Sequence, residues 1–550
     1  MTARTVVLGG YAAKSCARAT HNRYDATVPG QPAQTPPQLQ QLFDLGVAHE
    51  ADIFQKWLDA GTDVVDLSTL DDNKAAHVAA TLDAMLQGRQ VILGGRLPDD
   101  VVGGRGGKPD VLLRDLEGKG YHPADVKAHK VIDTKTSGGL TADMERPALA
   151  HATVSNVGLR YDQRDLLQLS HYWRMLQACG QQASAPFGAI IGTDGGELPR
   201  LAWYDLTAAL FVTFSRSQGK ASRSSLERYD HEHDFRVRIA RTAQLRTGSP
   251  TDPEPLVEPI GQDECITCAW APVCIDILPS GDLSRELQGT LTVREYLALR
   301  AAGVESVDDL VDADVDALLD TSYSDETSHV HGRARRLRKA HTEAQLAQAG
   351  VVLRIIPGAE LVVPRAEVEI DLDMECDREG RVYLWGALVT ANGTSSFHEF
   401  TDVSIVDDDS ERAVARRCFD WMATTYPDAL VFHYSSVEKT KAQRILGNHL
   451  LTYGGTSAAP SGWVDLLPAV RRCLESRQGL GLKVVATVGA DFHWRDEDPG
   501  GLQSQDWLDQ ARAGDPAALK RILTYNEDDV RATLAVREWL CATVATERCR

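Results

Sequence analysis

The stretch EVEIDLDMECD, residues 367–377, sets the fold of the C-terminal part of the chain. It predicts a β-strand that ends in the pair Asp373-x-Glu375. The segments VVLRII, RVYLWGALV and FHEFTDVSIV around it also have strand composition, and a helical pattern, ERAVARRCFDWMATTY, and a strand, ALVFHY, follow. This order of strands and helices predicts an α/β domain over residues 351–550.

A second set of acidic residues lies far from this strand in the sequence. LTYNEDDVRATLAVREWL predicts a helix on which Tyr525 and Asp529 are four residues apart and share a face. Between them, ALVFHYSSVEK contains Glu438 and GWVDLLPAVRR contains Asp465. Acids on strand ends and on a facing helix suit a two-metal site for in-line attack at phosphorus. Tyr525 is placed to orient the attacking water, with Asp465 outside the ring of ligands.

This order, with D-x-E on the first strands and Y-x3-D on the last helix, resembles the DEDD exonucleases of ribonuclease-H-like fold, in their tyrosine variant. The resemblance implies that Asp373, Glu375 and Asp529 bind Mg²⁺ or Mn²⁺ and that Tyr525 assists catalysis. The middle motif departs from the family, which has an Asp after an aromatic residue, because HYSSVE offers Glu438 instead. Glu also binds metal, with a longer side chain and a changed geometry.

A separate group of acids occurs near residue 110, where the sequence reads GGKPDVLLRD and then YHPADVKAHK. Asp110 opens an apolar run, and Asp125 and Lys127 end a second strand-like run. Residues two apart on a strand share a face, so Asp125 and Lys127 point the same way. Two carboxylates and a lysine that converge can hold a divalent metal and polarise an attacking water. A surface D-x-K pair is the plainer alternative.

Flanking motifs favour the catalytic interpretation. Upstream, FDLGVAHEADIFQKWL places His49 and Glu50 on a predicted amphipathic helix, and downstream DLLQLSHYWRML places Gln168 and Tyr172 four apart on one helical face. The order of these motifs resembles the PD-(D/E)xK nucleases of the RecB/AddB type, including the CRISPR-associated iron–sulfur exonucleases, over roughly residues 1–275. The resemblance implies the metal ligands His49, Asp110 and Asp125, a catalytic Lys127, and supporting roles for Gln168 and Tyr172.

Three cysteines fall within ECITCAWAPVC, residues 264–274, with the spacing C-x2-C-x5-C. The N-terminus lacks a signal-peptide pattern, so we expect a cytoplasmic protein, in which clustered thiols suggest metal rather than disulfides. The iron–sulfur branch of the resembled family has one cysteine before the nuclease core and this cluster after it. The resemblance therefore implies that Cys16, Cys265, Cys268 and Cys274 hold a 4Fe–4S cluster that clamps the two ends of the domain. Zinc, which also accepts four thiolates, is the rival.

The predicted fold class is α/β multidomain. Residues 1–275 form a PD-(D/E)xK restriction-endonuclease-like domain with an iron–sulfur cluster, and residues 351–550 form a ribonuclease-H-like DEDD exonuclease domain. Residues 276–350 have helical apolar spacing around Gly303 and resemble a helix-hairpin-helix module. The whole arrangement resembles the bacterial RecB-like nucleases that combine two nuclease domains.

Charge and missing motifs narrow the function. The 58 basic and 78 acidic residues give a net charge of −20, which argues against a globally basic nucleic-acid binder. The run RARRLRK, residues 333–339, is a local phosphate-binding track or a solvated face. GGRGGKPD, residues 103–110, has Pro109 where a phosphate loop needs Ser or Thr, so the protein would need a partner helicase or a naturally single-stranded substrate. No apolar run approaches the roughly 18 residues of a membrane span, so no membrane is expected as a partner.

The leading hypothesis is a metal-dependent DNA nuclease, an exonuclease on single-stranded DNA or DNA ends, that acts in DNA repair, recombination or defence. Two alternatives stay open. The net charge and the Glu438 departure motivate a DNA-end-binding scaffold in which one or both sites no longer cut. A ribonuclease is the other alternative, because ribonuclease-H-like folds process RNA as readily as DNA.

Overall fold

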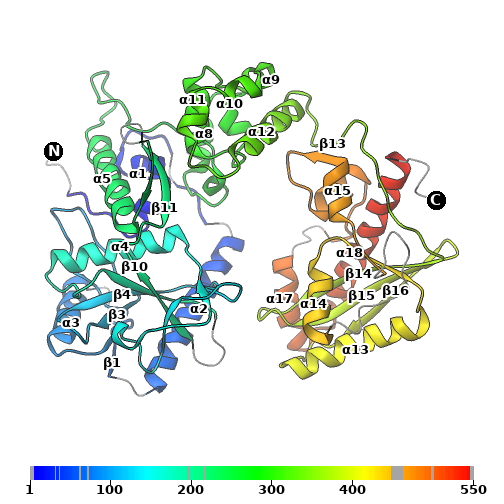
Figure 1. Ribbon diagram of the computed structural model, residues 1–550, viewed down its shortest axis with the longest axis horizontal. Helices are drawn as coiled ribbons and strands as arrows, with labels where there is room; N and C mark the ends of the chain where they lie inside the picture. The colour runs from blue at the N-terminus through cyan, green and yellow to red at the C-terminus, as the bar shows by residue number, and fades with distance from the viewer. Residues whose placement is uncertain are drawn as a thin grey trace. The chain divides into compact units, whose positions relative to one another are not determined.

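The computed structural model describes residues 5–30, 32–35, 37–60, 63–70, 73–194, 199–215, 219–447, 462–496 and 501–544. The chain divides into two compact α/β units, Met1–Ala340 and His341–Arg550, with the boundary inside helix α12 (Arg333–Gln348) (Figure 1). The finer predicted division, 1–275, 276–350 and 351–550, stays a prediction. None of the helices in the described ranges is long and apolar enough to cross a membrane.

The first unit is built on an eight-stranded sheet with the order β1-β2-β3-β4-β9-β10-β6-β7. Neighbouring strands are antiparallel except for the parallel pairs β1–β2 and β4–β9. The strands are β1 (Val64–Asp66), β2 (Val91–Leu93), β3 (Val111–Arg114), β4 (Tyr121–Val126), β6 (Leu140–Asp143), β7 (Thr153–Val154), β9 (Phe187–Ile191) and β10 (Arg200–Asp205).

Helices cover both faces of this sheet, so its central strands are buried. On one face, α2 (Pro37–Asp59) packs Ile53 and Trp57 against Ala124 and Val126 of β4. On the other face lie α3 (Lys74–Leu86) and α4 (Gln163–Ala178). Because side chains alternate along a strand, Asp125 points to the α4 face between two residues that face α2.

The N-terminal segment packs against residues 225–243 of the same unit. Helix α1 (Ala17–Tyr24) packs against α5 (Ser225–Ala243), and Val6, Leu8 and Val237 share a small core beside them. The remaining short elements of this region are η1 (Ala12–Lys14), β5 (Ile132–Asp133), η2 (Leu149–His151), β8 (Gly158–Leu159), β11 (Phe211–Ser215), β12 (Gly219–Arg223), η3 (Asp263–Ile266) and α6 (Ala271–Ile277).

Short helices follow: α7 (Leu283–Glu286), α8 (Val293–Ala301), α9 (Val307–Asp312), α10 (Val315–Leu319), α11 (Ser322–Glu326) and then α12. Gly303, between α8 and α9, has a φ of 81°, a conformation that glycine adopts without strain. The basic run at the start of α12 is partly used inside the fold, because Arg336 lies 3.0 Å from the buried carboxylate of Glu295. The resemblance to a helix-hairpin-helix module stays a prediction.

The second unit contains a five-stranded sheet with the order β16-β15-β14-β17-β18. The pairs β14–β15 and β15–β16 are antiparallel, whereas β14–β17 and β17–β18 are parallel. The elements are β13 (Leu353–Ile355), β14 (Val368–Cys376), β15 (Val382–Ala391), β16 (Thr394–Thr401), α13 (Asp408–Thr425), β17 (Leu430–His433), α14 (Val437–Leu446), β18 (Trp463–Asp465), α15 (Leu467–Cys473), β19 (Leu474–Ser476), α16 (Leu482–Val484), η5 (Val485–Gly489), α17 (Gly501–Arg512) and α18 (Pro516–Thr543).

Strand β14 alternates apolar and acidic residues, and each kind faces a different helix. Ile370 and Leu372 join the core that α13 closes on one face of the sheet. The acids at the alternate positions meet α18 and α17 on the other face. Two of them, Glu369 and Asp371, form ion pairs with the fully buried Arg537 of α18, with 2.9 Å between Arg537 Nη2 and Asp371 Oδ2. These ion pairs fix α18 across β14.

Gly386 of β15 permits α18 to approach the sheet this closely. It pairs with Asp373 of β14, and a Cβ atom at this position would lie 1.7 Å from Oδ1 of Asn526 on α18. Asn526 is fully buried, and its Nδ2 donates to Asp373 Oδ2 at 2.8 Å. A larger residue at 386 would therefore displace the amide that holds Asp373.

We expect Gly386→Ala to lower the free energy of unfolding of the second unit by about 1–3 kcal/mol, because the added methyl group overpacks a filled site. Denaturant unfolding followed by tryptophan fluorescence measures this. Gly481→Ala is the matched control, since a Cβ at Gly481 meets nothing within 4 Å and its φ is −69°. Equal unfolding midpoints for both variants would contradict the packing argument.

Candidate active sites

Three acids of the second unit converge where β14 faces α18. One ligand atom each from Asp373, Glu375 and Asp529 lies within 4.8 Å of the others, and no other group of three acidic, histidine or cysteine residues meets this condition in the described part of the chain. The sequence predicted all three as metal ligands. The strand repeat places Asp373 and Glu375 on one face, and α18 places Asp529 opposite them.

Each of these carboxylates is also held by a neutral hydrogen-bond donor. Besides the bond from Asn526 to Asp373, Ser504 Oγ donates to Glu375 Oε2 at 3.0 Å and Trp494 Nε1 donates to Asp529 Oδ1 at 2.9 Å. The donors fix one oxygen of each carboxylate. The cluster is therefore preorganised, because a cation can bind to it while these three hydrogen bonds stay in place.

Glu438, the residue that departs from the family motif, lies near the cluster. It is buried in the first turn of α14, and its charge raises the pKa of Asp373. Its Oε2 is buried without a hydrogen-bond donor among the described residues, although His433 Nδ1 lies 3.6 Å away. Asp465 instead accepts the backbone N–H of Leu467 at 3.0 Å, as a turn-forming residue does.

Burial and mutual repulsion shift the pKa values of the cluster upward. Burial, followed by the charges of Asp529 and Glu375, raises the pKa of Asp373 well above its ordinary value. Burial and the charge of Asp529 raise the pKa of Glu375 to about 8. Burial raises the pKa of Asp529 to about 6, against hydrogen bonds from Trp494 and Tyr525 that lower it. Additional positive charge near these carboxylates would therefore stabilise their ionised forms.

Lys483 supplies a positive charge near this cluster, and no sequence pattern predicted it. Its charge lowers the pKa values of both Glu375 and Asp529. Its Nζ lies 5.1 Å from the ring centroid of Tyr525 and 5.8 Å from that of Trp494. Tyr525, which the sequence predicted to be catalytic, is buried beside the acids, and burial and their charges raise its pKa.

The first unit brings Asp110, Asp125 and Lys127 together at the adjoining ends of β3 and β4. Asp110 Oδ2 accepts the backbone N–H of Val126 at 2.9 Å. Lys127 Nζ lies 2.8 Å from Asp125 Oδ2 and donates to Gln168 Oε1 at 3.2 Å. Asp125 is fully buried. The predicted D-x-K pair is thus an interior ion pair rather than a surface one.

Helix α4 adds Gln168 and Tyr172 to this site, one turn apart as predicted. Tyr172 is buried, and its hydroxyl donates to the backbone oxygen of Lys108 at 3.1 Å. Burial, and then the charges of Asp125 and Asp110, raise its pKa well above the ordinary value. Tyr172 therefore contacts the loop before Asp110, and Gln168 contacts the lysine that follows β4.

On α2, Glu50 rather than His49 is electrostatically coupled to the acids. Burial and the charge of Asp125 raise the pKa of Glu50, and Glu50 in turn raises that of Asp110. Burial lowers the pKa of His49, and the charges that act on it are those of Asp52 and Lys56, but a hydrogen bond to the backbone of Lys127 places its imidazole beside the D-x-K motif. The role of His49 as a ligand stays a prediction, and Glu50 is a third acid of the site.

Two residues of the N-terminal segment reach the same site and carry no sequence signal for it. The Lys14 ammonium donates to Gln168 Oε1 and lies 4.0 Å from the ring centroid of Tyr11. Burial raises the pKa of Tyr11, and the charges of Asp125 and Asp110 add to this. Burial lowers the pKa of Lys127, but Asp125 and Asp110 outweigh this and raise it above its ordinary value. Lys127 therefore stays protonated.

Cys16 lies near the three clustered cysteines, although it is far from them in sequence. Burial raises the pKa of Cys265 to about 11, and the thiolates of Cys16, Cys268 and Cys274 contribute. The backbone N–H of Cys16 donates to Glu264 Oε1 at 3.0 Å, and Asn22 Nδ2 lies 3.4 Å from Cys274 Sγ. No three of the four sulfurs lie within 4.8 Å of one another.

Comparison with known proteins agrees with the geometry of the second unit. Residues 371–541 match the model of the RNase H superfamily, so this part of the chain is an RNase H superfamily domain. The matched range contains all the acids of the cluster and Glu438. No curated protein matches the chain. An RNase H superfamily domain with an acidic cluster is consistent with a nuclease that binds divalent metal.

The pKa values predict that metal binding to this cluster strengthens as pH rises. The raised pKa of Glu375 means that its protonated form is stabilising below about pH 4.5, and that this stabilisation is lost as pH rises through about 8. A divalent cation binds the ionised form. We therefore expect the rise in melting temperature caused by Mn²⁺ to be larger at about pH 8 than at about pH 6.

Differential scanning calorimetry with and without Mn²⁺ measures this difference. Glu375→Gln removes the titrating group and should flatten the pH dependence. A Mn²⁺-induced shift of equal size at both pH values in the unsubstituted protein would contradict the assignment.

Proposed function

We propose that this protein is a metal-dependent nuclease that hydrolyses phosphodiester bonds at the cluster of Asp373, Glu375 and Asp529. The observation that carries the proposal is the convergence of three ligand atoms within 4.8 Å on the β14–α18 face. The RNase H superfamily match over the same residues supports it.

The residues fit divalent cations. The acids raise one another's pKa values, and a buried oxygen of Glu438 has no hydrogen-bond donor among the described residues. Carboxylate oxygens are the ligands that Mg²⁺ and Mn²⁺ prefer. Bound there, such cations would neutralise charge on the phosphate and lower the pKa of a coordinated water.

The remaining side chains position the reactants. The raised pKa of Tyr525 keeps its hydroxyl protonated, and this hydroxyl donates to Asp529. Its oxygen can therefore orient the attacking water by accepting a hydrogen bond from it, rather than by removing a proton. Lys483 places a positive charge beside Glu375 and Asp529, where it can contact a phosphate oxygen. Asn526, Ser504 and Trp494 keep the carboxylates in place.

We further propose that the first unit holds a second nuclease site of the RecB-like PD-(D/E)xK type. The specific observation that favours it is the buried Asp125–Lys127 ion pair, with Gln168 on the same ammonium. Because Lys127 stays protonated, its role is to stabilise negative charge on the phosphate. Asp110, Asp125 and the third acid, Glu50, are the candidate ligands of Mg²⁺ or Mn²⁺, with His49 kept as the family's expectation.

We also propose that the four cysteines hold a 4Fe–4S cluster. A single zinc also accepts four thiolates, so metal analysis has to separate the two. The motif order, with one cysteine before the D-x-K region and three after it, supports the iron–sulfur assignment. Hydrogen bonds to sulfur, such as the one from the Gln262 backbone to Cys265 Sγ at 3.4 Å, are typical of iron–sulfur sites.

The substrate we propose is DNA, as single strands or ends, with a helicase as the natural partner because the sequence has no motor motif. A repair, recombination or defence role follows from that substrate class. Cleavage of RNA by an RNase-H-like fold and DNA binding without cleavage are the competing outcomes of the experiment below.

In the Asp125→Asn background, where only the second site can cut, we expect Asp373→Asn to lower kcat by more than about 100-fold on 5′- and 3′-labelled single-stranded DNA with Mn²⁺, because a lost metal ligand removes several kcal/mol of transition-state stabilisation. The Asp125→Asn variant, tested in parallel, measures how much of the total cleavage the first unit catalyses. Asp409→Asn, at an exposed position of α13, is the control and should cut normally.

Cleavage by the double variant at the rate of Asp125→Asn would overturn the proposal for the second unit. Loss in Asp125→Asn alone would then assign the activity to the first unit. Binding of DNA without cleavage by every variant would identify a scaffold, and cleavage restricted to matched RNA would identify a ribonuclease.

For the cluster, we expect Cys265→Ser to lose bound iron and the associated visible absorbance after anaerobic purification, because one of four thiolate ligands is removed. Metal analysis of the purified proteins measures iron and zinc together. Cys179→Ser, whose thiol contacts the Leu176 carbonyl away from the cluster, should retain its iron. Stoichiometric zinc without iron in the unsubstituted protein would replace the iron–sulfur assignment.

A further inference from the structure

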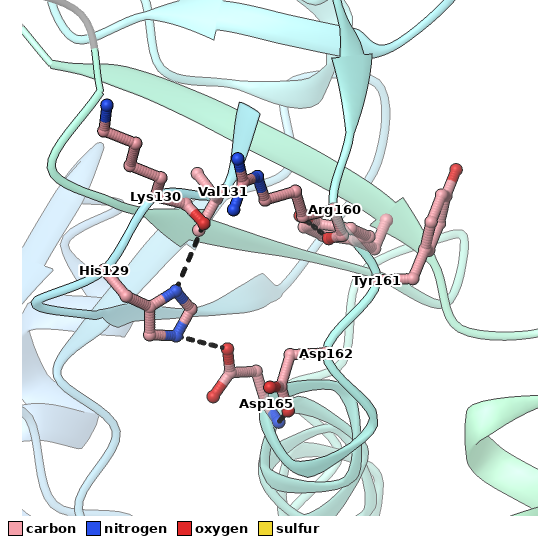
Figure 2. A pocket seen from close by; sticks show the side chains of 8 residues that line it. His129, Lys130, Val131, Arg160, Tyr161, Asp162 and Asp165 are labelled. Carbon is pink, nitrogen blue, oxygen red and sulfur yellow. Dashed lines mark hydrogen bonds and ion pairs between the residues drawn. The ribbon is translucent and has the colours of Figure 1, made fainter. Parts of the chain in front are cut away.

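A hollow of about 260 Å³ lies beside the acids of the first unit, and no predicted role accounts for it. One wall is His129–Val131, which begins two residues after Lys127. The other wall is Arg160–Asp162 with Asp165, at the start of α4, and Tyr204 of β10 completes the lining (Figure 2). The chain therefore passes directly from the D-x-K motif into the hollow.

The lining combines cations with carboxylates. Arg160 Nε donates to the Ile132 carbonyl at 3.1 Å, which fixes its guanidinium. Lys130 is exposed and forms no ion pair with any residue in the described ranges. On the opposite side, as Figure 2 shows, His129 Nε2 lies 2.9 Å from Asp165 Oδ2, and Asp162 caps α4. A simple anion would face the two carboxylates, so the lining suits a ligand with both acceptor and donor groups.

An aromatic ring at the rim adds a stacking surface. Tyr161 is 54% exposed, and its ring stands nearly perpendicular to that of Tyr204, with the centroids 5.6 Å apart. The buried Tyr204 anchors this corner, because its hydroxyl donates to the Arg160 carbonyl at 2.8 Å. Exposed aromatic rings beside fixed cations are the usual platform for bases of a single strand, whose phosphates the cations bind.

The hollow and the acids share one electrostatic environment. Burial raises the pKa of Asp165, and the charges of Lys127 and His129 act on it in the opposite direction. Asp165 thus lies between the ammonium of the D-x-K motif and the imidazole of the hollow. Three residues of extended chain span at most about 10 Å, so the Cα atom of Lys130 lies within about that distance of the Cα atom of Lys127.

We propose that this hollow binds one nucleotide of a single strand next to the scissile phosphate, with the base on Tyr161 and the phosphate between Lys130 and Arg160. Asp162 and Asp165 accept donors of the base or sugar. The proposal rests on the proposed nuclease function of the first unit. Its ligand chemistry is that of a single-stranded nucleic acid, and DNA and RNA are separated by the test.

The test measures binding apart from cleavage. Fluorescence anisotropy with labelled oligo(dT) and oligo(rU) in EDTA compares Tyr161→Ala, Tyr161→Phe and Lys130→Ala, with the exposed Lys119→Ala as the charge control. Loss of one stacked base should weaken Kd about 5-fold or more in Tyr161→Ala, whereas Tyr161→Phe keeps the ring and binds normally. Lys130→Ala should weaken binding more than Lys119→Ala. Thymidine 5′-monophosphate should compete, and inorganic phosphate at the same concentration should not.

Unchanged binding in both Tyr161→Ala and Lys130→Ala, or equal competition by inorganic phosphate, would overturn the inference. The Asp125→Asn variant distinguishes a failure of the nucleotide-site proposal from a failure of the proposed nuclease function. If Asp125→Asn is inactive and Tyr161→Ala binds normally, the nuclease site stands and the nucleotide site does not. If Tyr161→Ala binds weakly while Asp125→Asn cuts normally, the hollow binds a strand that is cut elsewhere.

Discussion

The second unit depends on one buried contact, the ion pairs of Arg537 with Glu369 and Asp371. Arg537 is fully buried on α18, and its guanidinium also lies 4.1 Å from the ring centroid of Phe432. Removing one partner of such a pair typically costs about 3–5 kcal/mol, because the other charge is left buried and unpaired. The contact therefore specifies where α18 crosses β14, and that crossing sets the positions of Asn526 and Asp529, which precede Arg537 on the same helix.

The acidic face of β14 stabilises the fold at one end and forms the candidate metal site at the other. Arg537 compensates Glu369 and Asp371, whereas among the described residues no cation forms an ion pair with Asp373 or Glu375, which are left to repel Asp529. A continuous acidic face on one strand is thus divided by a single arginine. Burial accompanies the stabilising ion pairs at the Arg537 end of β14, and it raises the pKa values of Asp373 and Glu375 at the other end. The packing that forms the domain therefore also produces a site that is stabilised by bound cations.

The sequence predicted those site residues that share a face because they lie on the same strand or the same helix. Asp373 and Glu375 share a strand face, Tyr525 and Asp529 share a helix face, and Lys127 follows Asp125 by one strand repeat. It could not predict Lys483, Asn526 or Gly386, because these meet the acids only once α16, α18 and β15 have packed. The helix that carries His49 and Glu50 shows the same limit. Both neighbours are polar, so the pattern could not fix which of them faces Asp125.

The two sites differ in how far the chain itself balances their charge. In the first unit, Glu50, Asp110 and Asp125 face the ammonium groups of Lys127 and Lys14. In the described part of the second unit, four carboxylates face the ammonium of Lys483.

When all these acids are ionised, the first site carries a small negative excess and the second a large one. One divalent cation compensates the first, whereas the second remains negative until two have bound. Lys14 lies two residues before Cys16, so whatever holds that cysteine also holds part of the first site's positive charge in place. We therefore expect the first site to depend on the integrity of the cysteine cluster and the second to depend on metal concentration.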